Sequence, residues 1–420
     1  MTHALSDGLA LHPFRALRPA VDSARLSRLL CPPYDVIDAD ERAQLLAADP
    51  DNAVGLILPE ATDGGDPYLQ AAQRLDQAVA DGLLATDAEP ALYVYEMQES
   101  GGATTRGLLG AVALRDPADG VILPHENTMA GPVADRLALM AATEANLEPI
   151  YLVYDGGGAA SQVVSSVDTQ APVAEASTPD GIRHRLWALT DPQTHRDVAT
   201  DLATRRALIA DGHHRYATYR ELAQQYDAER GPGPWDRGLT LLVDSSSYGP
   251  QVHAIHRVLD GVALDAVLAG SSAVGTVVDL PSIDAGMRLA EAVVGFAAVL
   301  TDGTRVVLLS DPAGKLAAAA TRPDEPASLG QLDVAVLHRG LVEQTLGLAD
   351  TVDVVGYAHS VDQAVAMAQR SGGTAVLLRP TPVAAVAAVA AAGARMPRKS
   401  TLFTPKPASG LVMRRFADER

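Results

Sequence analysis

Leu208-Ile209-Ala210-Asp211-Gly212-His213-His214-Arg215-Tyr216 joins an apolar, strand-like run to the start of an expected helix through a single glycine. Apolar residues then recur at spacings of three and four, which predicts a helix that begins near His213 and packs along one face: Tyr216, Tyr219, Leu222, Ala223 and Tyr226. A buried strand that leads through a tight turn into an amphipathic helix is typical of an α/β fold.

The turn has the composition of an anion-binding site. Free backbone N–H groups and the positive end of the helix dipole are expected beside Gly212, where a phosphate oxygen can approach without meeting a Cβ atom. Arg215 adds a permanent charge and Asp211 a carboxylate, while His213 and His214 can transfer a proton or bind a metal. The alternative is structural: Asp211 caps the helix and the histidines satisfy buried carbonyl groups.

A second polar segment, Pro124-His125-Glu126-Asn127-Thr128, follows the apolar run 120–123 and is expected to form a loop at the end of a strand. His125 or Glu126 can act as a general base toward a hydroxyl or a water molecule, and Glu126 can help to hold a divalent cation. The alternative is a polar loop with a helix cap at Thr128.

Two further segments carry candidate ligand-binding residues. In Pro32-Pro33-Tyr34-Asp35 the prolines stiffen a loop that presents a phenol and a carboxylate, which suits a pocket wall, although a plain turn has the same composition. Near the C-terminal end, Lys399, Ser400 and Lys406 lie in a cationic stretch of an otherwise acidic chain and are candidates for an anion site, a solvated basic turn being the alternative.

These segments resemble the signature of the family catalogued as domain of unknown function 1015. The resemblance spans nearly the whole chain and rests on 210–216, 32–37, 124–126 with 135–136, and 396–401 followed by 405–406. It implies an architecture and a set of residues, with Arg136 as a secondary phosphate ligand, but no reaction. The Gly-His-His-Arg turn is also similar to the phosphate-binding turns of the ParB, sulfiredoxin and free serine kinase superfamily, which implies a nucleotide phosphate at this helix start.

Composition places the chain among globular proteins and excludes several partners. Its 420 residues are 47% hydrophobic and 20% charged, and its formal net charge of −19 disfavours binding to nucleic acid or to an anionic membrane. The single cysteine, Cys31, cannot form an intrachain disulfide, which favours a reducing compartment. Residues 1–18 lack the pattern of a secretory signal, and the apolar run 383–394 is too short to cross a bilayer, so we expect a cytoplasmic protein. The composition fits a high-GC bacterial genome.

We expect an α/β fold of mixed sheets with flanking helices, divided into two or three subdomains around a shared cleft. The expected regions are an N-terminal α/β region over 11–155, a central region with the histidine turn over 160–265, and a C-terminal α/β region over 266–420. In the central region, alternation over 253–258 predicts one strand with His253, Ile255 and Arg257 on one side. Asp135 and Arg136 are expected to open a helix.

The function favoured by these residues is a nucleotide-dependent phosphotransferase that acts on a small molecule, with ATP or ADP and Mg²⁺ as cofactors. Phosphoryl transfer needs mainly positioning and charge neutralisation, which the turn and the lysines can supply. The remote kinase resemblance alone suggests an amino acid such as serine as the acceptor. The alternatives are a phosphatase of a small phosphometabolite, with His213 or His214 as base or nucleophile, and a non-catalytic nucleotide-binding or sensor protein.

Overall fold

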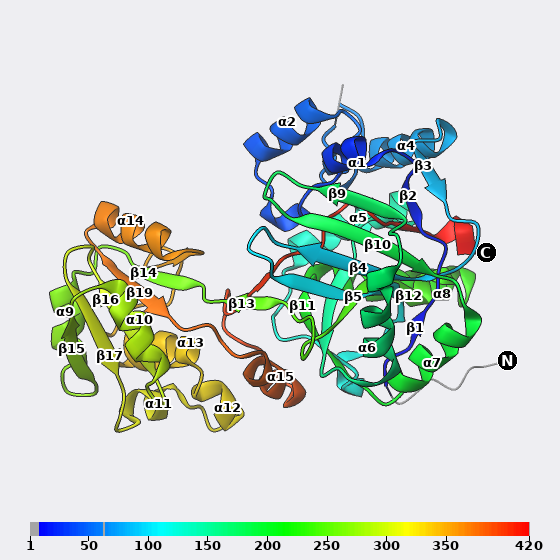
Figure 1. Ribbon diagram of the computed structural model, residues 1–420. Coiled ribbons are helices and arrows are strands. Elements are labelled where there is room, and N and C mark those ends of the chain that lie inside the picture. Colours follow the sequence, from blue (N-terminus) through cyan, green and yellow to red (C-terminus); the bar gives the residue numbers. More distant parts are fainter. Residues whose placement is uncertain (1–7, 62–63, 420) are drawn as a thin grey trace. The chain divides into compact units, whose positions relative to one another are not determined.

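Figure 1 shows the computed structural model of the chain, which describes residues 8–61 and 64–419. The described residues up to Pro250 and those from Pro405 onward form one compact unit, and Gln251–Thr404 forms a second. The second unit is therefore inserted into the sequence of the first, and the C-terminal segment 405–419 belongs to the first unit. The division into regions 11–155, 160–265 and 266–420 stays a prediction about the organisation of the sequence.

The first unit is built on a nine-stranded mixed sheet. Parallel pairing joins β11 to β6 and β12 to β8, whereas the other neighbours pair antiparallel. In spatial order the strands are β6 (Ile122–Leu123), β11 (Ala207–Asp211), β8 (Ile150–Tyr154), β12 (Arg237–Asp244), β5 (Thr104–Ala113), β4 (Leu92–Gln98), β10 (Arg183–Leu189) and β9 (Ala174–Ser177), with β1 (Leu11–His12) beside β5.

Two short strand pairs and eight α-helices complete the described part of this unit. Helix α5 packs on α4 and α8, and α6 packs on α7. In Figure 1, α1, α2 and α4 lie together at the top of the unit. The pairs are β2 (Leu17–Pro19) with β3 (Leu84–Thr86) and β7 (Ala145–Asn146) with β21 (Arg414–Arg415); the helices are α1 (Ser23–Leu29), α2 (Ala39–Ala48), α3 (Val54–Ile57), α4 (Pro67–Ala80), α5 (Ala130–Thr143), α6 (Gly158–Ser165), α7 (Pro192–Leu202) and α8 (His213–Arg230).

The core of the first unit explains why β11 and α8 form where the sequence predicts them. Strand β8 is buried along its whole length, as is most of β11, so both carry continuous apolar runs. The five predicted apolar residues of α8 are all buried in the same hydrophobic cluster as these strands. The mixed α/β class expected from the sequence is confirmed.

The second unit has a six-stranded antiparallel sheet of its own. Its spatial order is β15 (Thr276–Leu280), β17 (Val306–Ser310), β16 (Ala297–Thr301), β19 (Thr374–Leu378), β14 (His256–Leu259) and β18 (Val355–Ala358), and a separate pair joins β13 (Gln251–His253) to β20 (Leu402–Thr404). The helices are α9 (Leu264–Ser271), α10 (Ile283–Glu291), α11 (Lys315–Ala320), α12 (Ala327–Gly330), α13 (Asp333–Ala335), α14 (Val361–Ser371) and α15 (Val383–Ala391), with a π-helix at Val336–Thr345.

The structure corrects two local expectations. The predicted strand over 253–258 is two strands, because β13 pairs with β20 whereas β14 pairs with β18 and β19, so the chain changes sheets between them. Asp135 and Arg136 lie in the middle of α5 rather than at its start. This helix begins at Ala130, and Pro132 falls in its first turn, where the missing N–H group costs no hydrogen bond.

Over the described ranges, none of the helices combines the length and the apolar character that crossing a bilayer requires.

Candidate functional site

The turn between β11 and α8 has the backbone geometry that the sequence predicts. Gly212 is the N-cap residue of α8 and has φ +89°, a left-handed backbone conformation that residues other than glycine rarely adopt. No side chain of the described residues caps this end of the helix. A Cβ atom on Gly212 would lie 3.1 Å from Nε of Arg215, so a side chain at this position would crowd the guanidinium group.

Arg215 is held rigidly beneath the turn. Its side chain is 4% exposed, and it donates to Asp211 Oδ2 at 2.5 Å and to the carbonyl oxygen of Pro149 at 2.5 Å. Burial lowers the pKa of this guanidinium group, but the carboxylates of Glu148, Asp211 and Asp35 outweigh burial and raise the pKa above its usual value. Arg215 is therefore a permanent, nearly immobile cation.

Lys406 brings the C-terminal segment to the same turn. Its Nζ donates to Asp211 Oδ1 at 2.5 Å and lies 3.4 Å from Asp35 Oδ2. Burial lowers the pKa of Lys406, yet these two carboxylates raise it above its usual value, so the lysine is charged at neutral pH. One ammonium group thus joins β11, the loop at Asp35 and the C-terminal segment.

The loop that carries Tyr34 and Asp35 forms a short 3-10 helix, Tyr34–Val36, after the two prolines. The Tyr34 ring lies under the guanidinium group of Arg136, with 4.3 Å from the ring centre to Cζ. Burial raises the pKa of Tyr34 to about 12, so its phenol is protonated at neutral pH. Asp35, by contrast, is exposed and can meet a ligand from solvent.

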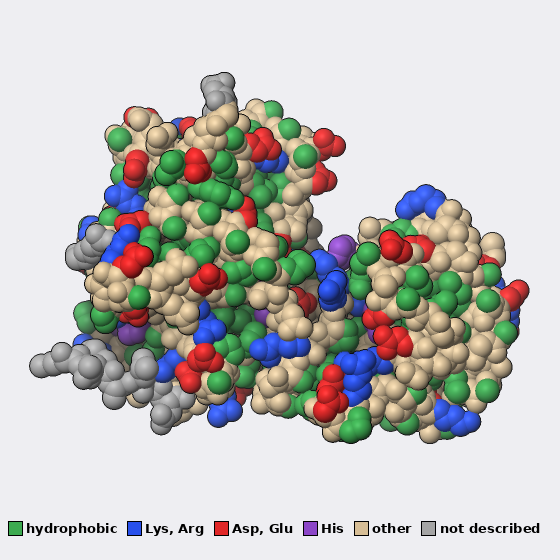
Figure 2. Space-filling model, turned by 180° about the vertical axis from the view of Figure 1, so that it is seen from behind, with side chains coloured by type: hydrophobic (Ala, Val, Ile, Leu, Met, Phe, Trp, Pro, Cys, Tyr) green, Lys and Arg blue, Asp and Glu red, His purple; other side chains and the backbone are tan. Residues whose placement is uncertain are grey.

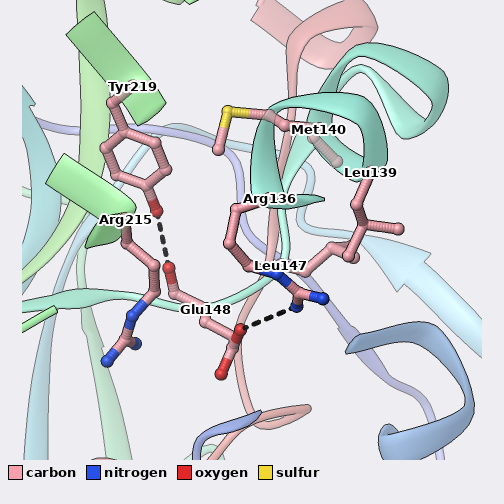
Figure 3. A pocket seen from close by; sticks show the side chains of 8 residues that line it. Arg136, Leu139, Met140, Leu147, Glu148, Arg215 and Tyr219 are labelled. Atoms are coloured by element: carbon pink, nitrogen blue, oxygen red, sulfur yellow. Dashed lines mark hydrogen bonds and ion pairs between the residues drawn. The ribbon is translucent and has the colours of Figure 1, made fainter. Parts of the chain in front are cut away.

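Glu148 is a residue of this site that the sequence analysis did not select. Its buried carboxylate accepts from the Tyr34 backbone N–H at 3.1 Å and from Ser409 Oγ at 3.0 Å, and lies 4.0 Å from Arg136. Figure 3 shows the guanidinium groups of Arg136 and Arg215 on either side of it, at the wall of a pocket with about 290 Å³ of empty space, part of it open to solvent. The sequence offered one signal for Glu148: it is a carboxylate between Leu147 and Pro149, directly before the buried strand β8.

The loop 124–129 is attached to the start of α8 by backbone hydrogen bonds to the two histidines. The N–H of His125 donates to His213 Nε2 at 3.2 Å, and the N–H of Met129 donates to His214 Nε2 at 3.1 Å. The side chain of His125 is fully buried, whereas about a third of the Glu126 side chain is exposed. Glu126 is therefore the member of this loop that can best reach a bound molecule.

The other predicted residues have structural partners or lie elsewhere. Arg136 is buried and donates to the carbonyl oxygen of Ile57 and to Asp135. Lys399 and Ser400 lie in the second unit, where Arg257 donates to the carbonyl oxygen of Lys399 at 2.9 Å. Lys399 is exposed, and Ser400 is buried with its hydroxyl on the carbonyl oxygen of Pro397.

The first unit thus brings together residues from five separate segments. The cluster contains Tyr34, Asp35, Glu148, Asp211, Gly212, His213, His214, Arg215 and Lys406, and the loop that carries Glu126 is bonded to its two histidines. On the face drawn in Figure 2, acidic and basic side chains are mixed over both units, so attraction of an anion has to come from local cations such as Arg215 and Lys406. Among the described residues, no group of three or more His, Cys, Asp or Glu side chains is arranged to hold a metal ion.

A family model described as "Protein of unknown function (DUF1015)" matches residues 11–335. A comparison with curated proteins gave no match. Similar solved structures include free serine kinase in complex with AMP, with 14% identity, a TM-score of 0.34 and coverage of 67% of this chain and 83% of that chain. A conserved hypothetical protein from Pyrococcus furiosus has 15% identity and a TM-score of 0.34, with coverage of 71% of this chain and 94% of that chain. SbnI with a C-terminal truncation, from Staphylococcus aureus, has 11% identity and a TM-score of 0.34, with coverage of 72% of this chain and 86% of that chain. At such TM-scores, function has to be argued from the residues of this chain.

Proposed function

This chain belongs to the DUF1015 family, whose description assigns no reaction, and we propose that it binds a nucleotide phosphate at the β11–α8 turn and transfers a phosphoryl group to a small molecule. The observation that carries this proposal is at Arg215. Its Nε atom is buried and has no hydrogen-bond acceptor within the part of the chain that the structure describes. A buried, charged N–H group without an acceptor costs free energy, which a ligand oxygen beside Gly212 would recover.

The surroundings of this N–H group suit a phosphate. The N-terminal end of an 18-residue helix carries a partial positive charge, and Gly212 allows close approach of an oxygen atom. Lys406 is the second cation beside the turn: its ammonium group lies on Asp211, and we expect it to turn toward a bound phosphate, while Arg215 stays fixed. Together they would neutralise the charge of a polyphosphate.

Glu126 is the residue that we assign to the acceptor. It lies on the loop bound to His213 and His214, and its carboxylate can accept the proton of an attacking hydroxyl group. The side chain of Glu126 is about a third exposed, whereas that of His125 is buried, so we assign this role to Glu126.

Asp35 and Asp211 fit a magnesium ion that arrives with the nucleotide rather than a resident metal. They are two carboxylates on either side of one ammonium group, and Mg²⁺ in nucleotide sites is commonly held by one or two carboxylates together with phosphate oxygens and water. These two residues would hold the ion, which when bound neutralises charge on the phosphates.

The test is calorimetric titration of the purified chain with ADP and Mg²⁺. Lys406→Met is expected to weaken ADP binding by about 10- to 100-fold, because a hydrogen bond to a charged group contributes about 1.5 to 3 kcal/mol. Lys315→Met, which changes an exposed helix-start lysine of the second unit, serves as the matched control and should leave the affinity unchanged. The variant Lys399→Met measures whether the other predicted lysine contributes to ADP binding.

Equal ADP affinity in the Lys406→Met variant and the unchanged chain would refute the role of Lys406. Turnover assays with ATP then separate the alternatives. ADP release that requires an added hydroxyl compound such as serine supports phosphotransfer, release without an acceptor supports hydrolysis, and binding without turnover supports a sensor.

A further inference from the structure

His213 and His214 are consecutive, and each accepts a hydrogen bond from the backbone of the same loop. The two donors, the N–H groups of His125 and Met129, lie on either side of Glu126. The His125 and His213 rings also meet edge to face, with 4.6 Å between their centres. The loop is thus attached to the helix start at two points that enclose one acidic residue.

The direction of these hydrogen bonds determines what the imidazole rings can do. A backbone N–H group can only donate, so Nε2 of each histidine must carry a lone pair and no proton. A neutral ring then has its proton on Nδ1. Since the lone pair at Nε2 is already used, that atom can neither take a substrate proton nor bind a metal without releasing the loop.

Burial holds both rings in place against the loop. His213 is 8% exposed and His214 is partly buried. Both rings are therefore suited to a fixed accepting role.

We propose that His213 and His214 are positioning residues, which hold the loop 124–129 against the start of α8 through neutral, Nε2-accepting rings and so keep Glu126 at the phosphate site. The proposal rests on the function assigned above only in the role of Glu126. The histidine pair acts as a clamp on the loop instead of as the base or nucleophile suggested by the sequence.

The first test is independent of any ligand. Nitrogen-15 NMR of the histidine-labelled full chain distinguishes a protonated from an unprotonated ring nitrogen, and we expect protonated Nδ1 and unprotonated Nε2 for both residues. Amide hydrogen exchange of His125 and Met129 should be slow in the unchanged chain and faster in His213→Leu and His214→Leu, respectively. A proton on Nε2 of either ring would overturn the proposal.

The second test uses replacement by glutamine, whose side-chain oxygen can accept the same N–H group, whereas leucine cannot. ATP turnover should fall by about 100-fold in the leucine variants, the order of a general base put out of place, and should be largely kept in His213→Gln and His214→Gln. ADP affinity should be similar in all of them. Glutamine variants as inactive as the leucine variants would overturn the clamp, whereas failure of the unchanged chain to bind ADP would refute only the nucleotide function, since the NMR and exchange results still decide the proposal.

Discussion

Arg215→Met is expected to lower the free energy of unfolding of the first unit by about 3 to 5 kcal/mol, the cost of breaking a buried ion pair by removing one partner. The loss of the guanidinium group removes one cationic partner from Asp211 and a donor from the carbonyl oxygen of Pro149. It also removes a positive charge beside the buried Glu148. Binding of ADP should be lost with it.

Urea denaturation followed by tryptophan fluorescence measures this change in the right unit, because both tryptophans, Trp187 and Trp235, lie in the first unit. Arg220→Met is the matched control on the same helix. Arg220 pairs with the largely exposed Asp116, and such a surface ion pair contributes less than about 1 kcal/mol. Similar losses in the two variants would contradict the special role of Arg215.

Arg414→Met is the second change with a large expected effect, again about 3 to 5 kcal/mol in the free energy of unfolding of the first unit. Arg414 is completely buried and donates to Glu419 at 2.6 Å, to the carbonyl oxygens of Pro234 and Arg237 at 2.6 and 2.8 Å, and to Asn146. Its guanidinium group attaches the C-terminal segment that carries Lys406 to the unit. Loss of this attachment should therefore also weaken ADP binding.

The neighbouring Arg415 provides the control. It is partly exposed and lies 3.6 Å from Asp76 and 3.9 Å from Asp418, so Arg415→Met should change stability by less than about 1 kcal/mol. Limited proteolysis gives a second measurement, since the segment after Pro405 should be cut early only in Arg414→Met. Equal resistance of both variants would show that Arg414 does not attach the segment.

The local part of the site could be predicted from the sequence because short-range patterns determine it. The apolar run before Gly212 predicts β11, and the apolar residues that recur every three or four positions from Tyr216 to Tyr226 predict the start of α8. The sequence also selected Lys406 and Asp35 by composition, but their shared contact joins positions 371 residues apart, and no local pattern contains such a pairing.

The parts that sequence analysis missed depend on tertiary contacts. Glu148 is recognisable only when the arginines beside it are seen together, because its own neighbours in sequence are apolar or proline. Residue type alone also does not show that Nε2 of His213 and of His214 accepts a backbone N–H group of the loop 124–129. Apolar and polar residues alternate over 253–258 as they do in a single strand. The segment is seen to be two strands only because β13 and β14 pair with different strands.

The most direct test of the phosphate site is ADP calorimetry on Gly212→Ala, with Gly231→Ala as its control. Both glycines have positive φ, +89° and +76°, at the two ends of α8, so both substitutions should strain the backbone, by about 1 to 3 kcal/mol. Only the methyl group at 212 enters the space beside Arg215, since a Cβ atom at 231 meets nothing within 4 Å. We expect ADP binding to be lost in Gly212→Ala and unchanged in Gly231→Ala; unchanged binding in Gly212→Ala would contradict a phosphate site at this turn.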